Sequence, residues 1–136
     1  MDLADRQHRM IEDLLLIEDA QERLAAIVDR GRSRPPLGAA ERTEANRVAG
    51  CISAAWVTVE WQDGRASFRG DADSPLVRGL VLLLCDLHSG AGAAEVLAAA
   101  TDCVARLGLD RQLSPTRLNG LRSVQARLRA LAAAAG

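Results

Sequence analysis

A long aliphatic stretch in the middle of the chain constrains the fold more than any other feature. Ser74 and Pro75 match the N-cap and the first position of a helix, and Gly90 ends it. Apolar residues lie on most sides of this predicted helix: Leu76, Val77, Leu80, Val81, Leu83, Leu84 and Leu87. A helix that is apolar around most of its circumference is buried. We therefore predict a central helix packed on a sheet.

The chain before this helix changes to the periodicity of β-strands. Val48 and the segments 56–61 and 65–68 predict three short strands. The Asp63-Gly64 pair favours a tight hairpin turn between the last two. The predicted fold class is therefore α+β, with a small three-stranded antiparallel sheet packed against several α-helices. At 136 residues, the chain suits a single domain covering residues 1–136.

The N-terminal part is predicted to form two amphipathic helices. The second runs over about residues 20–30, with Asp19 as its cap and Gly31 as its stop. The Pro35-Pro36 pair then predicts an extended connector, because proline cannot continue a helix.

Shorter helices and one long helix are expected after the central helix. A short helix is predicted over 93–99, and another is predicted to be capped by Thr101 and to end at Gly108. Ser114-Pro115 opens the last helix by the same capping logic as the central one. Three basic residues are expected on its outer side: Arg122, Arg127 and Arg129.

Composition excludes several classes of function. All basic residues are arginine, so the chain has no amine for a Schiff base with pyridoxal phosphate and no phosphate-binding Gly-Lys-Ser/Thr loop. The net charge of -1 gives no global field to recruit nucleic acid or an anionic membrane. The N-terminus does not resemble a signal peptide, and the aliphatic run 80–85 is too short for a membrane span. We expect a cytoplasmic protein with reduced thiols.

Three cysteines lack the close pairs that metal sites and dithiol motifs use, so no metal site is predicted. Cys85 and Cys103 fall within predicted helices and are expected to fill the core. Cys51 falls between predicted strands, with Gly50 and Ser53 beside it, on a connection that a partner can reach. A reactive thiol must ionise, because the thiolate is the nucleophile. These residues alone leave both a reactive and a packing role open for Cys51.

Three motifs follow one another along the chain. The first is Gly50-Cys51-Ile52-Ser53-Ala54-Ala55-Trp56, preceded by Val48. The second covers 68–80, with Gly70-Asp71-Ala72-Asp73-Ser74 at its centre, and the third covers 113–121. Their order and spacing resemble the SufE family of sulfur-acceptor proteins, in either its SufE or its CsdE type. The resemblance covers most of the chain and implies a SufE/NifU-like fold.

This resemblance implies a sulfur carrier rather than a stand-alone enzyme. Cys51 is expected to take persulfide sulfur from a PLP-dependent cysteine desulfurase of the SufS or CsdA type, and to enhance its activity. The sulfur is then passed to an iron-sulfur scaffold of the SufBCD type. PLP is expected on the partner and no cofactor on this chain, which fits the absence of lysine. The protein is expected to be a monomer or a homodimer.

The resemblance also implies which residues support Cys51. They are Gly50, Ser53, Trp56, Asp71, Asp73 and Arg117. Gly50 is expected to act as a hinge, with Ala49, Ile52 and Trp56 as an apolar cover. Asp73 is expected to cap the central helix, and Arg117 to pair with a carboxylate or to tie loops together.

The sequence leaves other functions open. A CsdE-type acceptor would feed tRNA modification, and a non-covalent interaction module would regulate a desulfurase without carrying sulfur. A hydrolase with Cys51 as nucleophile would need a base such as His88 and an oxyanion pocket.

Overall fold

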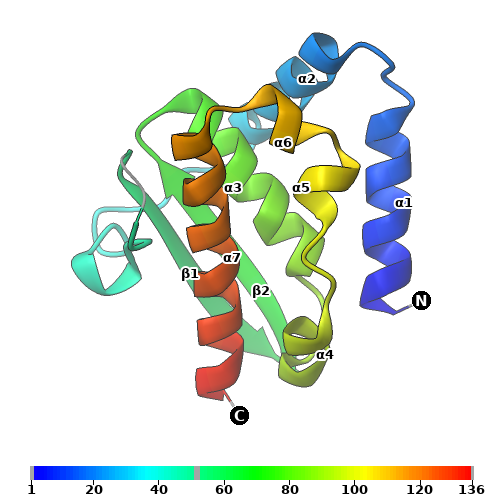
Figure 1. Ribbon diagram of the computed structural model, residues 1–136. Coiled ribbons are helices and arrows are strands. Elements are labelled where there is room, and N and C mark those ends of the chain that lie inside the picture. Colours follow the sequence, from blue (N-terminus) through cyan, green and yellow to red (C-terminus); the bar gives the residue numbers. More distant parts are fainter. Residues whose placement is uncertain (1, 51–52, 136) are drawn as a thin grey trace.

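The computed structural model describes residues 2–50 and 53–135. Its elements in chain order are α1 (Leu3–Leu15), α2 (Ala20–Arg32), the 3-10 helix η1 (Glu44–Asn46), β1 (Ala55–Gln62), β2 (Arg65–Ala72), α3 (Pro75–His88), α4 (Ala93–Ala98), α5 (Cys103–Arg106), α6 (Leu109–Gln112) and α7 (Pro115–Ala135). The fold class is α+β, as predicted, with helices packed on an antiparallel hairpin (Figure 1).

Helix α3 is the centre of the fold, which confirms the prediction from its aliphatic sequence. Ser74 is the N-cap, and its side chain accepts a hydrogen bond from the Val77 amide. Most of the helix is buried, including Leu80, Val81 and Leu84. One side of the helix packs on β2, and its other sides pack on α1, α2 and α7. Because neighbours surround it, apolar residues are buried around most of its circumference.

The sheet contains two strands within the described residues, so the prediction of three is wrong. Asp63 and Gly64 both have positive φ, as expected for the predicted hairpin turn. In place of the strand predicted at Val48, the structure has a single β-bridge between Arg47 and Trp56. Gly50, with φ at 86°, turns the chain soon after this bridge, so a longer ladder does not form.

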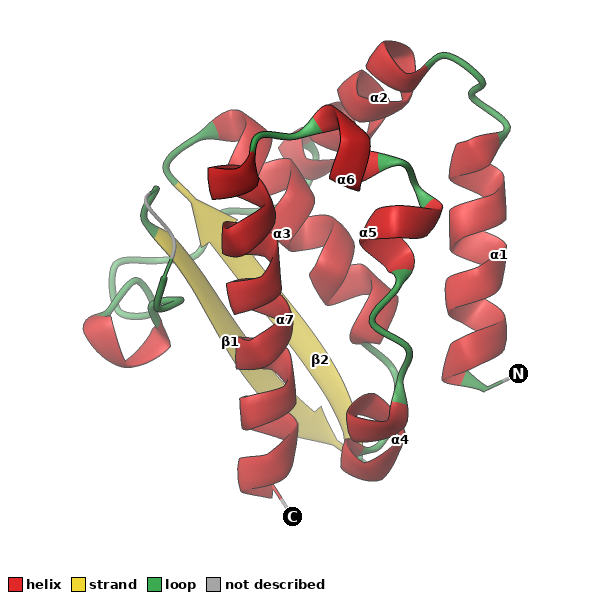
Figure 2. Ribbon diagram, in the orientation of Figure 1, coloured by secondary structure: helices red, strands yellow, loops and turns green. Residues whose placement is uncertain are grey.

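The two faces of the hairpin have different partners. Val57 and Phe68 on one face belong to the hydrophobic core. Helices α3 and α7 cover this face of the hairpin (Figure 2). Trp56 of β1 lies directly across from Asp71 of β2 in the strand register, and both residues are on the opposite face of the sheet. The connector between α2 and η1 reaches this opposite face, because the Leu37 amide donates to Asp71 Oδ2 at 3.0 Å.

Helices α2 and α3 cross at two glycines. Gly31 lies inside α2 and is buried, so the prediction that it ends this helix is wrong. A Cβ on Gly31 would lie 3.0 Å from Gly79 Cα, and one on Gly79 would lie 2.8 Å from Val28 Cα. Tertiary contact therefore explains this glycine better than helix termination.

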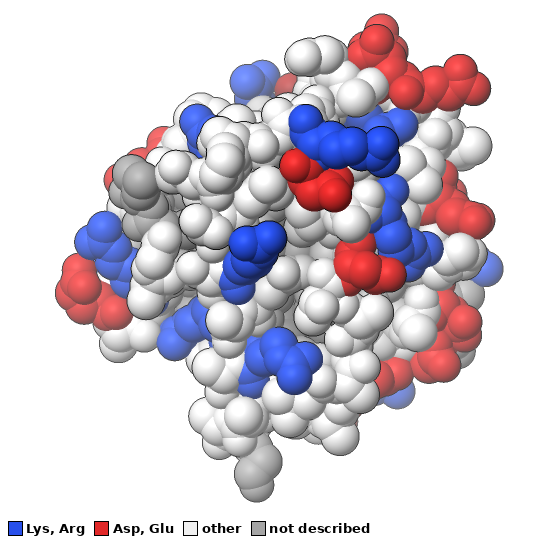
Figure 3. Space-filling model, in the orientation of Figure 1, with Lys and Arg blue, Asp and Glu red and all other residues white. Residues whose placement is uncertain are grey.

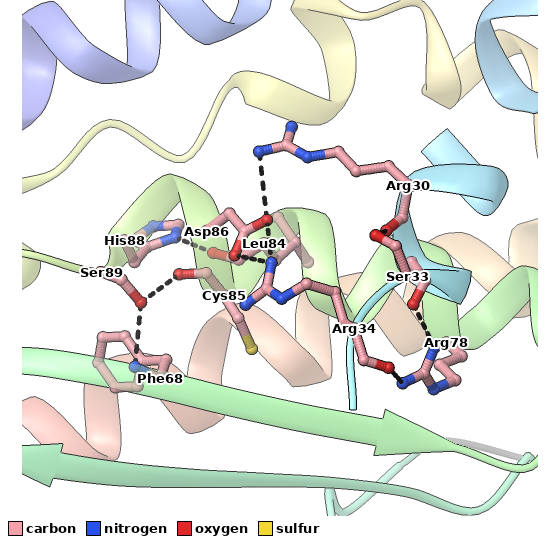
Figure 4. A network of polar contacts seen from close by, with 11 residues as sticks. Arg30, Ser33, Arg34, Phe68, Arg78, Leu84, Cys85, Asp86, His88 and Ser89 are labelled. Atoms are coloured by element: carbon pink, nitrogen blue, oxygen red, sulfur yellow. Dashed lines mark hydrogen bonds and ion pairs between the residues drawn. The ribbon is translucent and has the colours of Figure 1, made fainter. Parts of the chain in front are cut away.

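A polar network joins the C-terminal end of α2 to α3 (Figure 4). Arg78 of α3 donates to the carbonyl oxygens of Gly31 and Arg34. Asp86, near the end of α3, pairs with Arg34 at 2.7 Å and with Arg30 at 3.3 Å. Arg78 thus ties the first half of α3 to the C-terminal end of α2, where the Gly31 carbonyl oxygen also accepts from the Arg34 amide.

The helices after α3 agree with prediction except that α6 was not predicted and that α5 begins later than expected. Helix α4 lies where a short helix was expected, and Pro115 is the first residue of α7. The N-cap of α5 is Asp102 rather than the predicted Thr101, and no side-chain hydrogen bond caps this short helix. Cys103 is its first residue.

Candidate functional site

An apolar cavity of about 210 Å³ lies between α3 and α7, beside the segment that carries Cys51. Val77, Leu80 and Val81 of α3 line it from one side, and Val124 of α7 lines it from another. Ser53 lies on its wall. Cys51 and Ile52 themselves lie outside the described residues. The cavity is assigned to this segment because Ser53, which follows them, lines it.

Four residues hold the two ends of this segment together, and we call them the loop root: Arg47, Val48, Ala55 and Trp56. The Val48 amide donates to the Ala55 carbonyl oxygen at 2.8 Å, next to the bridge between Arg47 and Trp56. Ala54, next to the root, is tied to the segment that leads into α3, since the Asp73 amide donates to the Ala54 carbonyl oxygen at 3.0 Å.

Gly50 meets two conditions that favour glycine. Its φ of 86° lies in the left-handed region, which most side chains avoid. A Cβ at this position would also lie 2.6 Å from Ser123 Oγ of α7. The backbone conformation at Gly50 therefore disfavours a side chain, and any Cβ there would also require the Ser123 hydroxyl to rotate away.

Trp56 lies half-buried under an arginine rather than fully packed in the core. The guanidinium carbon of Arg42 is 4.4 Å from the centre of the Trp56 ring, within the range of a cation–π interaction. Arg42 also pairs with Asp73 at 3.2 Å. Asp73 is thus an exposed ion-pair partner, and the prediction that it caps α3 is wrong because Ser74 holds that position.

Asp71 is the most deeply buried carboxylate of the site, with its side chain 3% exposed. Oδ1 accepts from Arg78 Nε at 2.8 Å, and Oδ2 accepts from the Leu37 amide. Arg42 Nε lies 3.7 Å from Oδ2. One carboxylate thus joins β2, α3 and the connector behind the loop root.

The sequence of this chain matches a known family over most of its length. Residues 8–132 match SufE, described as an Fe-S metabolism associated domain. This chain belongs to the SufE family. Its relatives include an uncharacterized SufE-like protein of Rhizobium etli, which is 34% identical over 126 residues, covering 89% of this chain and 85% of the relative. Another, of Rhizobium meliloti, is 32% identical over 126 residues, covering 89% and 90% respectively.

A solved structure shows the same fold. The solution structure of a hypothetical protein from Thermus thermophilus superposes with a TM-score of 0.79 and covers 99% of this chain and 98% of its own. At 21% identity, this likeness concerns the fold alone. Family membership assigns this SufE-family protein a sulfur-related role in Fe-S metabolism.

Arg117 brings positive charge to the cavity of this SufE-family protein. It lies in the first turn of α7 and lines the cavity with Ser53. Its guanidinium forms no ion pair with the described residues, so the predicted pairing with a carboxylate is not observed there. The sequence of α7 contains arginines but no acidic residue. Figure 3 shows arginine atoms over its face, while acidic atoms lie along the right edge, in the middle and at the left of the view.

The other two cysteines are core residues, as predicted. Cys85 and Cys103 are buried free thiols. Burial raises the pKa of the Cys85 thiol to about 12, with a smaller contribution from Asp86. Burial also raises the pKa of Cys103. Both thiols stay protonated near neutral pH, and a protonated thiol is a poor nucleophile.

His88 does not provide a base for the hydrolase hypothesis. Its ring is buried at the C-terminal end of α3, where Nδ1 lies 2.8 Å from the Leu84 carbonyl oxygen. Burial lowers its pKa. Val77, which lines the cavity, lies eleven residues earlier, roughly 16 Å along the helix axis. His88 is therefore remote from the residues that flank Cys51.

The described parts of the chain offer neither a metal site nor a membrane span. Residues 2–50 and 53–135 contain no cluster of three or more His, Cys, Asp or Glu side chains that could hold a metal ion. In the same ranges, no helix has the length and apolar character needed to cross a membrane.

The sequence analysis misplaced three arginines, two of them close to the site. Arg42 has the local pattern of a solvated charged segment, but it covers Trp56. Arg127 was expected on the outside of α7, but it is half-buried and reaches β1. Arg129 was also expected outside, but its Nη1 donates to the Leu97 carbonyl oxygen at 2.7 Å. Each contact joins segments apart in sequence, which local patterns do not reveal.

Proposed function

We propose that Cys51 accepts sulfane sulfur from a PLP-dependent cysteine desulfurase and passes it to an iron-sulfur scaffold. The observation that carries the proposal is the apolar cavity lined by Ser53, two residues from Cys51. Membership of the SufE family, which works with cysteine desulfurases in Fe-S metabolism, supports the same role.

The reaction needs one nucleophilic displacement at each transfer. The Cys51 thiolate attacks the terminal sulfur of the desulfurase persulfide, and the sulfur–sulfur bond of that persulfide breaks. The desulfurase cysteine leaves as a thiolate, so atoms and electrons balance without an external oxidant. A scaffold thiolate then attacks the Cys51 persulfide in the same way.

The surroundings suit each requirement of this chemistry. A positive group near the cysteine favours the thiolate, and Arg117 supplies one at the cavity. The apolar part of the cavity wall, which includes Leu80 and Val124, would shelter a persulfide from oxidation between encounters. With no lysine in the chain, the PLP chemistry belongs to the partner.

Mass spectrometry tests this function directly. The protein is incubated with free cysteine and a cysteine desulfurase, and any adduct is mapped by peptide. We expect addition of one sulfur atom at Cys51, lost in Cys51→Ser and retained in Cys85→Ser and Cys103→Ser. Absence of an adduct with both SufS-type and CsdA-type desulfurases would refute sulfur acceptance. Desulfurase activation retained by Cys51→Ala would then support the non-covalent module instead.

A further inference from the structure

Arg127 bridges α7 and the edge of β1 that faces away from β2, and α7 and β1 run side by side (Figure 1). Its Nη2 donates to the Val57 carbonyl oxygen at 3.2 Å and to Asn46 Oδ1 at 3.5 Å. Strand β2 occupies the other edge of β1, so the guanidinium binds where the missing third strand would have paired. Its Nε is buried without a partner among the described residues. The guanidinium is therefore partly desolvated, and its Nε loses contact with water without gaining an acceptor among those residues.

The acceptors of Arg127 adjoin the loop root. Asn46 is the last residue of η1 and directly precedes Arg47, while Val57 directly follows Trp56. Asn46 is fixed from its other side, since its Nδ2 donates to the Glu41 carbonyl oxygen at 2.9 Å. One guanidinium thus contacts the chain on both sides of the loop that carries Cys51.

The same face of α7 forms the cavity wall. Gly120 and Val124 line the cavity and lie seven and three residues before Arg127, so all three share one helix face. Ser123 of α7 closely approaches Gly50. The position of α7 along β1 therefore sets the position of the cavity relative to the loop root.

We propose that Arg127 is a positioning residue for Cys51. By joining α7 to Val57 and Asn46, it fixes the ends of the Cys51 loop relative to the cavity. It acts through this geometry and does not touch the transferred sulfur. The inference rests on the proposed role of Cys51 as sulfur acceptor.

The test compares the alkylation rates of all three cysteines. Arg127→Met keeps much of the side-chain volume but removes both hydrogen bonds. Arg129→Met is the matched control, because Arg129 is also half-buried on α7 and donates to a backbone carbonyl oxygen, that of Leu97. Native protein is treated with iodoacetamide, and peptide mapping gives the modification rate at each cysteine.

We expect Arg127→Met to raise the rate at Cys51 about tenfold, equivalent to about 1.4 kcal/mol, as for loss of a charge-assisted hydrogen bond. The rates at Cys85 and Cys103 should not rise comparably, because these buried thiols react only when the core opens. Arg129→Met should leave the Cys51 rate unchanged. A Cys51 rate that stays constant in Arg127→Met, or that rises only in parallel with Cys85 and Cys103, would overturn the proposal.

Two further measurements separate positioning from general stability and from the proposed function. Arg127→Lys, which keeps one cationic donor, should give a Cys51 rate between those of the native protein and Arg127→Met. A rate equal to that of Arg127→Met would count against the hydrogen bonds. Alkylation needs no desulfurase, so the rate comparison stands even if native Cys51 accepts no sulfur, in which case only the proposed function fails.

Discussion

Replacing Asp71 by asparagine isolates the charge of the most deeply buried carboxylate of the site. The substitution keeps the side-chain volume and one carbonyl oxygen, which can still accept from Arg78 Nε. It replaces the oxygen that faces the Leu37 amide with an amide group that only donates. The change therefore leaves a buried guanidinium without its counter-ion and a buried backbone N–H without an acceptor.

The magnitude follows from these two losses. Removing one partner of a buried ion pair costs about 3–5 kcal/mol. The low end applies, because Arg78 is 15% exposed and keeps its bonds to the Gly31 and Arg34 carbonyl oxygens. We therefore expect Asp71→Asn to lower the free energy of unfolding by about 3 kcal/mol, a large part of the roughly 5–15 kcal/mol typical of a domain.

Urea denaturation followed by circular dichroism measures this change. With a slope of about 1.5 kcal/mol/M, the midpoint should fall by about 2 M. Asp73→Asn is the matched control, since Asp73 also pairs with Arg42 but is 64% exposed, and surface pairs contribute about 0–1 kcal/mol. Equal midpoints for the two variants would refute the claim that Asp71 anchors the connector, β2 and α3 together.

Two further predictions concern the core. Gly79→Ala places a Cβ 2.8 Å from Val28 Cα, so α2 must shift, and we expect a loss of about 2 kcal/mol in urea denaturation, whereas Gly38→Ala, with nothing within 4 Å, should change stability little. The folded pKa of Cys85 is raised to about 12 from 9.0, so its contribution to stability is fully present below pH 9 and is lost as pH rises from 9 to about 12. Denaturation across this range should show a steeper decline for the native protein than for Cys85→Ala, and identical slopes would contradict the buried, protonated thiol.

The sequence predicted those parts of the fold that depend on neighbours a few residues apart. Ser74 and Pro75 predict the start of α3 because an N-cap and a fixed φ act within one turn. Asp63-Gly64 predicts the hairpin because positive φ at both residues matches the twist of the strands. The motifs that resemble the SufE family also single out the segment around Cys51 as the proposed site. Each motif is a short run of neighbouring residues and can be recognised without the structure.

Only the tertiary structure decided how distant segments meet. Gly31 has the local character of a helix stop, yet it packs against Gly79, 48 positions along the chain. Arg127 has the periodicity of an outer residue, yet it bonds to Val57 on β1. Val48 has strand propensity, but the turn at Gly50 limits it to the loop root. Capping and periodicity act locally, whereas close approach and buried ion pairs depend on which surfaces meet when the whole chain packs.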